Sequence, residues 1–176
     1  MNLPENAEKD LWFPDGNVII RAGERLCRVY KGFLTSQSPV LADMFSIPQP
    51  PDAQTIDGLP VVVFPDAPEE VLHWLKAMLS PESFEVYPVK IEMRKLFAVL
   101  RLSHKYDVQY LRQRALYHLS TDLLTELETT FPLAGYPQDS SVLNGSYLQY
   151  HEFLLDVVPL AREVDAAWLL PPALHY

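Results

Sequence analysis

The stretch from residue 26 to residue 45 constrains the fold of this chain more than any other. Residues 26–30 alternate in polarity, which is typical of a strand and places Cys27 and Val29 on one face. A short helical turn follows at once, and Ser38-Pro39 then opens a second helix that ends at Phe45. Such a beginning needs further strands and helices to cover it, and the rest of the chain supplies them.

Strands dominate the amino-terminal part of the sequence. Residues 11–13 and 18–20 are apolar and flank the turn sequence Pro14-Asp15-Gly16-Asn17. In that turn Pro sets φ at the first corner and Gly supplies a positive φ, so we expect a hairpin of two strands. The run Val61-Val62-Val63-Phe64 is continuously apolar, which is expected of a strand covered on both faces.

Helical periodicity begins after residue 65. Asp66 lies three residues before Glu69 and predicts the start of a helix, which Ser80-Pro81 ends. A further helix over residues 93–102 has a broad apolar face, and Asp107 is expected to cap the helix after it. Strands first and helices afterwards predict an α+β fold rather than repeated βαβ units.

The carboxyl-terminal part is expected to be an addition to a single domain. We predict a domain over residues 10–120 and a helical extension over residues 121–176. In the stretches 102–116 and 160–174 the residues Leu, Asp, Leu, Ala and Leu recur at a fixed offset, with Asp107 and Asp165 in corresponding places. This echo predicts one helical hairpin used twice, in which Asp caps the second helix. The second copy stops soon after its final helix begins, so we expect the natural chain to continue past Tyr176.

Composition excludes several classes of protein. The 176 residues, 48% of them hydrophobic, suffice for one sizeable core. No apolar run approaches the roughly 20 residues of a membrane span, and the amino terminus lacks the features of a signal peptide. The net charge of −9 argues against nucleic-acid binding. The single cysteine, Cys27, rules out an internal disulfide and favours an intracellular protein, in the nucleus or the cytoplasm.

The charges are unevenly distributed along the chain. Seven of the 14 basic residues fall between residues 90 and 114, whereas Arg162 is the only one beyond residue 120, among many acids. We call the following six residues the basic stripe: Arg94, Lys95, Arg101, Lys105, Arg112 and Arg114. Two interpretations are open. The stripe is a solvated helix face, or it meets an acidic partner, which could be the tail of this same chain.

No catalytic or metal-binding motif is present. The chain has no Gly-x-Ser-x-Gly elbow, no Gly-rich phosphate loop and no His-Glu-x-x-His helix. No two histidines have the spacing of three or four residues that places two ligands on one helix face. We therefore predict a protein that is not an enzyme and has no cofactor or metal. The alternative is an enzyme with a dispersed site near His151, where Glu152, Tyr147 and Tyr150 are close in sequence.

The order of elements and several short motifs resemble a BTB/POZ domain, and in particular the fungal class of BTB proteins that carry a helical C-terminal extension. The resemblance covers roughly residues 10–120. The motifs that carry it are Asp15-Gly-Asn-Val-Ile19, Arg28-Val-Tyr-Lys-Gly-Phe-Leu34, Ser38-Pro-Val-Leu-Ala-Asp-Met-Phe45, Asp57-Gly-Leu-Pro-Val-Val62 and Leu102-Ser-His-Lys-Tyr-Asp-Val-Gln-Tyr-Leu111.

The resemblance implies a protein–protein interaction module without enzymatic activity, commonly a homodimer. Many members are adaptors or scaffolds, and some serve cullin-type ubiquitin ligases. Dimerisation in the family uses the first helices, which correspond here to Phe33, Leu34, Val40, Leu41 and Phe45. A competing hypothesis is a monomeric variant whose acidic tail covers the dimer surface.

The sequence departs from the family pattern at three places. Tyr30 replaces the histidine that is usual at the junction of strand and helix. Asn17 replaces the aspartate that pairs with the following basic residue, although Lys31 itself is kept. An amide can hydrogen-bond to Lys31 but cannot form an ion pair with it, which argues against a co-repressor type of pocket. Residues 80–85 do not match the hydrophobic-x-Glu signature of cullin-binding members.

Overall fold

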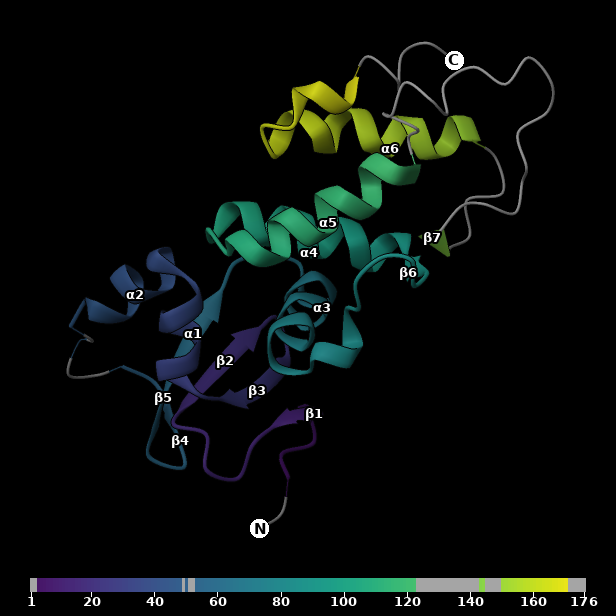
Figure 1. Cartoon of the computed structure of the whole chain (residues 1–176). Coiled ribbons are helices and arrows are strands. Elements are labelled where there is room, and N and C mark those ends of the chain that lie inside the picture. Colours follow the sequence, from purple (N-terminus) through teal and green to yellow (C-terminus); the bar gives the residue numbers. More distant parts are fainter. Residues whose placement is uncertain (1–2, 49, 51–52, 123–142, 145–149, 171–176) are drawn as a thin grey trace, which may run out of the picture.

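The computed structural model describes residues 3–48, 50, 53–122, 143–144 and 150–170 (Figure 1). The elements of the first half are β1 (Ala7–Trp12), β2 (Val18–Ala22), β3 (Arg25–Val29), α1 (Lys31–Gln37), α2 (Pro39–Ser46), β4 (Thr55–Ile56) and β5 (Leu59–Phe64). Those that follow are α3 (Pro68–Leu79), the 3₁₀ turn η1 (Pro81–Ser83), β6 (Ile91–Glu92), α4 (Met93–Lys105), α5 (Gln109–Asp122), β7 (Leu143–Asn144), α6 (Tyr150–Glu163) and the 3₁₀ turn η2 (Ala167–Leu169). The predicted α+β class is confirmed.

Five strands form one mixed sheet in the order β1-β3-β2-β5-β4. β2 pairs antiparallel with β3 and parallel with β5, whereas β1 pairs parallel with β3. The hairpin predicted over residues 11–20 is therefore wrong, because β1 and β2 lie on opposite sides of β3. The N–H of Phe13 donates to the carbonyl of Arg28 and the N–H of Asn17 to that of Val29, both at 2.9 Å. The predicted turn does form, since the N–H of Gly16 donates to the carbonyl of Phe13 at 3.0 Å, but the loop crosses the end of β3 and does not join β1 to β2 as a hairpin.

Gly16 is needed in this loop for a reason that differs from the expected positive φ. The positive-φ glycines of the described chain are Gly23 and Gly58. A Cβ at Gly16 would lie 2.9 Å from Cγ of Arg28 and 3.0 Å from its carbonyl carbon and oxygen. Only a residue without a side chain lets the loop pass so close to β3.

The main core lies between one face of the sheet and the helices. Its largest fully buried side chains include Trp74 of α3 and Leu96 and Leu100 of α4. The other face of the sheet carries a small cluster of Ile19, Leu26 and Val61 that contains no helix residue. Because no helix residue joins that cluster, the run from Val61 to Phe64 is not covered on both faces as predicted, and Val63 is 55% exposed.

Two of the predicted helix starts have different outcomes. Ser38 caps α2 as expected, since its Oγ accepts a hydrogen bond from the N–H of Leu41 at 2.9 Å. Asp66, by contrast, does not cap α3, which begins at Pro68 after Ala67 and has no side-chain cap. The carboxylate of Asp66 instead contacts Lys105 and accepts a hydrogen bond from the hydroxyl of Tyr106 at 2.6 Å. It therefore ties the end of α4 to the loop before α3.

The prediction that Asp107 caps α5 is likewise wrong, because Asp107 lies at the end of α4. Its φ is 54°, in the left-handed region, and Asp165 at the end of α6 has a φ of 52°. The N–H of the residue after each aspartate donates to a carbonyl five residues earlier, which is the hydrogen bond of a Schellman helix end. The sequence echo is thus a repeated way of ending a helix.

The described part of the extension packs on the main core. Residues of α6, of η2 and of the link between them that are at most 1% exposed belong to the same cluster as the side chains of α3, α4 and α5; they are Val157, Leu160, Ala161, Val164, Ala166 and Leu169. In Figure 1, α6 lies over α5 at one end of the molecule, and α1 and α2 lie beside β5 at the other. No helix in the described ranges is long and apolar enough to cross a membrane.

Candidate interaction surfaces

The junction of β3, α1 and α2 is fixed by a few polar contacts. Oδ1 of Asn17 accepts a hydrogen bond from the backbone N–H of Lys31 at 2.8 Å, at the amino end of α1. Nζ of Lys31 donates to the carbonyl of Phe45 at 3.2 Å and lies 5.5 Å from the centre of its ring. Asn17 therefore holds the helix end and leaves the ammonium of Lys31 to α2. The amide in place of a carboxylate is consistent with this division.

Tyr30 has a second role at the same junction. Its hydroxyl donates to Oδ1 of Asp15 at 2.7 Å, and its ring lies 5.0 Å from that of Phe13. The hydrogen bond to Asp15 is the first cause of a raised pKa of the Tyr30 hydroxyl, since ionisation would place a phenolate beside a carboxylate. These contacts hold the 13–17 loop against the start of α1.

The α1–α2 surface is formed by the exposed apolar side chains Phe33, Val40 and Ile47, which are 38%, 40% and 63% exposed. The sequence predicted Phe33 and Val40 for an interface. It missed Ile47, which lies just past the end of α2, where helical periodicity gives no signal. The only charged residues within α1 and α2 are Lys31 and Asp43. An apolar surface with so few charges is suited to a protein partner.

The other predicted interface residues require correction. Leu34 and Leu41 are fully buried in the core of the single chain, so neither side chain is accessible to a second copy. Both side chains point inward because they lie on the apolar faces of α1 and α2, which are turned toward the core. Phe45 is half-buried and packs against the same core. Phe33 and Val40 are the members of the predicted set that are exposed enough to meet a partner directly.

A second apolar surface lies at the loop between α3 and α4. Val86, Tyr87 and Val89 are 59%, 37% and 39% exposed there, and Tyr117 of α5 is 56% exposed. The rings of Tyr87 and Tyr117 meet edge to face at 5.5 Å. Phe84, the large hydrophobic residue of the stretch 80–85, is fully buried. It therefore contributes nothing to this surface.

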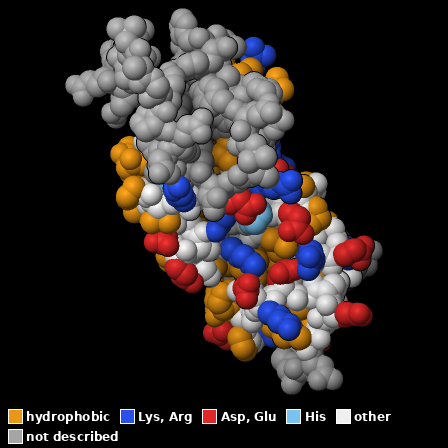
Figure 2. Space-filling view, turned by 90° about the vertical axis from the view of Figure 1, so that its right-hand side faces the viewer, with side chains coloured by type: hydrophobic (Ala, Val, Ile, Leu, Met, Phe, Trp, Pro, Cys, Tyr) orange, Lys and Arg blue, Asp and Glu red, His pale blue; other side chains and the backbone are white. Residues whose placement is uncertain are grey.

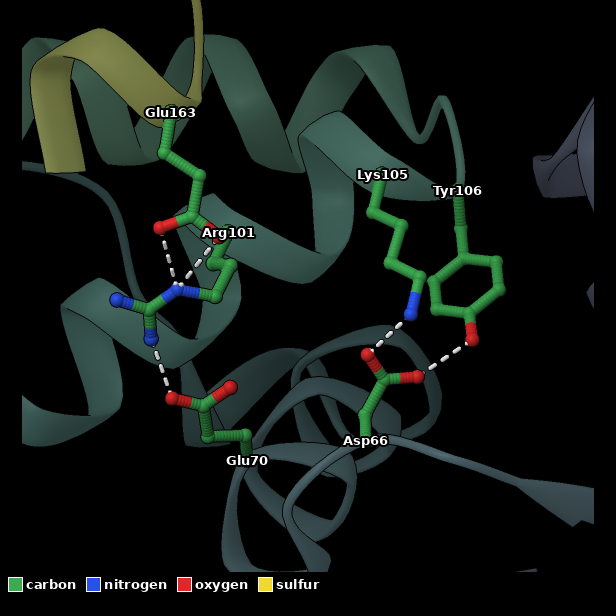
Figure 3. A network of polar contacts seen from close by, with 6 residues as sticks. All are labelled: Asp66, Glu70, Arg101, Lys105, Tyr106 and Glu163. Atoms are coloured by element: carbon green, nitrogen blue, oxygen red, sulfur yellow. Dashed lines mark hydrogen bonds and ion pairs between the residues drawn. The ribbon is translucent and has the colours of Figure 1, made fainter.

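Most of the basic stripe is engaged within the chain. Arg101 bonds both Glu70 of α3 and Glu163 of α6, and Lys105 pairs with Asp66 (Figure 3). Arg112 donates to the carbonyl of Val164 at 2.9 Å and Arg114 to that of Phe84 at 2.7 Å. Arg94 is exposed and Lys95 is half-buried. Four of the six predicted partner-facing residues thus hold the molecule together, and two of these, Arg101 and Arg112, hold its own tail.

The described residues include one small hollow and a histidine with a shifted pKa, and neither gathers a set of residues typical of a catalytic site. One shallow hollow of about 270 Å³ is lined by Glu82, Ser83, Glu85, Val89, Lys90, Ile91, Glu92 and Lys95. Burial lowers the pKa of His73 on α3, where Glu92 and Lys95 exert opposite effects. The face seen in Figure 2 has acidic and basic side chains intermixed around a histidine. In the described ranges no cluster of His, Cys, Asp or Glu could hold a metal ion.

The alternative enzyme site near His151 lies outside the side chains that the structure describes. Tyr147 lies outside the described residues, and for Tyr150, His151 and Glu152 only their place at the start of α6 is described. The alternative with a tail over the dimer surface concerns residues 121–176. The described part of that tail, from 150 to 170, lies on α4 and α5 and away from the α1–α2 surface (Figure 1).

Comparison with known proteins adds no identification. No family model matches the chain, and no curated protein matches its sequence.

Proposed function

We propose that this chain is a BTB/POZ-type protein–protein interaction module without enzymatic activity, which forms a homodimer through the α1–α2 surface. The order of its elements supports the proposal, since a β2–β3 hairpin leads into two short helices and β5 then joins β2 before the helical part. Within the proposal the protein is an intracellular adaptor or scaffold.

The observation that carries the proposal is the α1–α2 surface itself. Phe33 and Val40 are exposed on α1 and α2, which contain only two charged residues, and Ile47 is exposed directly after α2. A homodimer with a two-fold axis uses the same patch on both copies, so an apolar and nearly uncharged patch is favourable because it brings no like charges together. A stable interface of ordinary size buries about 800 Å² on each copy.

Sedimentation or light scattering of the full chain tests the homodimer. We expect a mass of twice 20.1 kDa at micromolar concentration. The double variant Phe33→Glu, Val40→Glu should be a folded monomer, because it places buried charges in the contact. The matched control is Val63→Glu, since Val63 is 55% exposed and alternation along β5 places it with Val61 on the face of the sheet whose cluster contains no helix residue. A wild-type mass of 20.1 kDa over the whole concentration range would exclude this function.

The adaptor role needs a second partner, and the surface at Val86, Tyr87, Val89 and Tyr117 is the place where we expect it. A purified cullin amino-terminal domain is the first protein to test, by calorimetry with wild type and with Val86→Glu. Binding that Val86→Glu abolishes supports a ligase adaptor. Absence of binding at tens of micromolar removes the cullin from the proposal and leaves the homodimer untouched.

A further inference from the structure

A fully buried histidine holds the loop between α3 and α4. Nε2 of His118, on α5, lies 3.0 Å from the carbonyl oxygen of Glu85, and His118 is 0% exposed. A carbonyl oxygen can only accept, so Nε2 must carry the proton of the neutral ring. Nδ1 is then an acceptor, and it is buried without a hydrogen-bond partner in the described part of the chain. The rings of Phe84 and Tyr87 flank the imidazole at 5.9 and 6.4 Å.

Arg114 holds the neighbouring carbonyl of the same loop. It lies one turn before His118 on α5, and its Nη1 donates to the carbonyl of Phe84 at 2.7 Å. Two side chains of one helix therefore bind two consecutive carbonyl groups of the loop. The guanidinium of Arg114 keeps its charge at every accessible pH, whereas an imidazole changes charge near neutrality. The charge of Arg114 therefore stays constant in acid, whereas that of His118 can change.

The surroundings of His118 disfavour its protonated form. A second proton would sit on Nδ1, for which the described residues provide no acceptor, and one turn from the charge of Arg114. The hollow that Glu85 also lines carries further charged groups, which are Glu82, Lys90, Glu92 and Lys95. Burial lowers the pKa of His118; the hydrogen bond to Glu85 opposes this, and Arg114 adds to it. None of the nearby carboxylates is hydrogen-bonded to the ring.

The loop is able to respond locally. Glu85, Val86 and Tyr87 are exposed or nearly so, whereas Phe84 is buried and is held by Arg114. The backbone hydrogen bonds described for residues 84–89 are local: the N–H of Phe84 donates to the carbonyl of Pro81, and the N–H of Val89 donates to that of Val86. Release of the Glu85 carbonyl therefore requires no change in the sheet.

We propose that His118 is an acid-sensitive clamp: opening of residues 85–87 away from α5 exposes the ring, which then takes up a proton at Nδ1, while Arg114 keeps Phe84 in place. Release frees the ring to take up a proton and to be hydrated. It also changes the exposure and arrangement of Val86 and Tyr87, the apolar side chains of the second surface. The clamp stands on the contacts of His118 and does not depend on the proposed homodimer.

The pH dependence of the release has a defined size. The released ring has an ordinary histidine pKa of about 6.5, and the clamped ring a lower one. Between these two values one proton is taken up on release, so the equilibrium constant for release rises about tenfold for each unit of falling pH. Above the ordinary histidine pKa it should not depend on pH.

Two measurements on the full chain test the clamp. Nuclear magnetic resonance follows the ring of His118 and the amide exchange of Val89, whose N–H donates to the carbonyl of Val86 at 3.2 Å, between pH 7.5 and 5, corrected for the intrinsic exchange rate. We expect the corrected exchange of this amide to rise as stated, while amides of β2 and α4 stay protected. In His118→Gln the side-chain amide can still donate to Glu85 but does not titrate, so the rise should vanish. In His73→Gln, the matched control, it should persist.

Several results would overturn the proposal. One is a ring of His118 that titrates at or above the ordinary histidine pKa in the native chain. Another is exchange at the amide of Val89 that rises equally in His118→Gln, and a third is a simultaneous rise in all core amides, which would indicate global unfolding. If His118→Gln does not fold, the ring titration and the exchange profile of the wild-type chain still decide.

Discussion

Asp107 and Asp165 occupy the same position at the ends of two different helices, each in a left-handed backbone conformation with φ of 54° and 52°. The N–H of Val108 donates to the carbonyl of Ser103 and that of Ala166 to the carbonyl of Ala161, both at 2.8 Å. α4 and α6 therefore end in the same way. The side chain of His104, near the end of α4, lies 3.7 Å from Asp165, so the two helix ends also meet.

The left-handed position of Asp165 predicts opposite effects of two small substitutions. Asp165→Gly should keep or raise the free energy of unfolding, by up to about 1 kcal/mol, because glycine adopts this conformation without a steric cost. Asp165→Ala should lower it by about 1 kcal/mol. Both variants remove the contact with His104, so their difference isolates the backbone. Urea denaturation measures both, with Asp43→Ala as an exposed control; equal stability of the two variants would contradict the assignment.

Arg101 joins α3 and α6 through Glu70 and Glu163. Arg101→Met should lower the free energy of unfolding by about 1 kcal/mol, because the pairs are partly exposed and water screens them. A double-mutant cycle with Glu163→Gln in urea measures the coupling, which should be a few tenths of a kcal/mol and should shrink at high salt. Strictly additive effects would mean that the pair of Arg101 and Glu163 contributes nothing.

Gly16 and Gly32 provide a matched pair of glycines. Gly16→Ala should lower the free energy of unfolding by about 1–3 kcal/mol, because the new Cβ meets the side chain and backbone of Arg28. Gly32 lies in α1 with nothing within 4 Å of an added Cβ, so Gly32→Ala should raise it by up to about 1 kcal/mol. Thermal unfolding of both variants checks the prediction. A stable Gly16→Ala would show that the loop can move away from β3.

Cys27 should be chemically inert in the native chain. Burial raises the pKa of its thiol to about 12, with Glu8 as a smaller cause in the same direction. The folded chain keeps the proton that the unfolded chain loses above its ordinary pKa of 9.0, so stability should fall as pH rises from 9.0 toward about 12. At pH 8 a disulfide reagent should label Cys27 only after addition of urea. Rapid labelling of the native chain would contradict its burial.

Local patterns in the sequence predicted some elements and failed at others for identifiable reasons. The cap of Ser38 on α2 depends on a hydrogen bond between residues three apart, so the sequence predicts it well. The pairing of β1 depends on where the 13–17 loop passes. A turn sequence looks the same whether the two strands beside it pair with each other or, as β1 and β2 do, each pair with a third strand. Asp66 looks like a cap in sequence, but a contact with Lys105 and Tyr106, distant in the chain, decides its role.

The candidate surfaces divide in the same way. Leu34 and Val40 are both apolar residues of short helices, and nothing in the sequence tells which of them the core takes. Leu34 is fully buried because it lies on the side of α1 that faces the core. Val40 is 40% exposed because it lies on the outer side of α2. Arg101 and Arg94 were equally plausible members of the basic stripe, yet only Arg101 meets acids from two other helices.

By itself the sequence determined the α+β class, the second capped helix and the recurrence of a helix end at Asp107 and Asp165, because these depend on periodicity and on residues near in the chain. The tertiary structure alone decided the strand order, the inward use of Arg101, Lys105, Arg112 and Arg114, and the burial of His118 against the loop at Glu85. Those features depend on pairings between distant residues. The packing of the whole chain decides which partner a strand edge or a Lys or Arg side chain meets, among many possible ones.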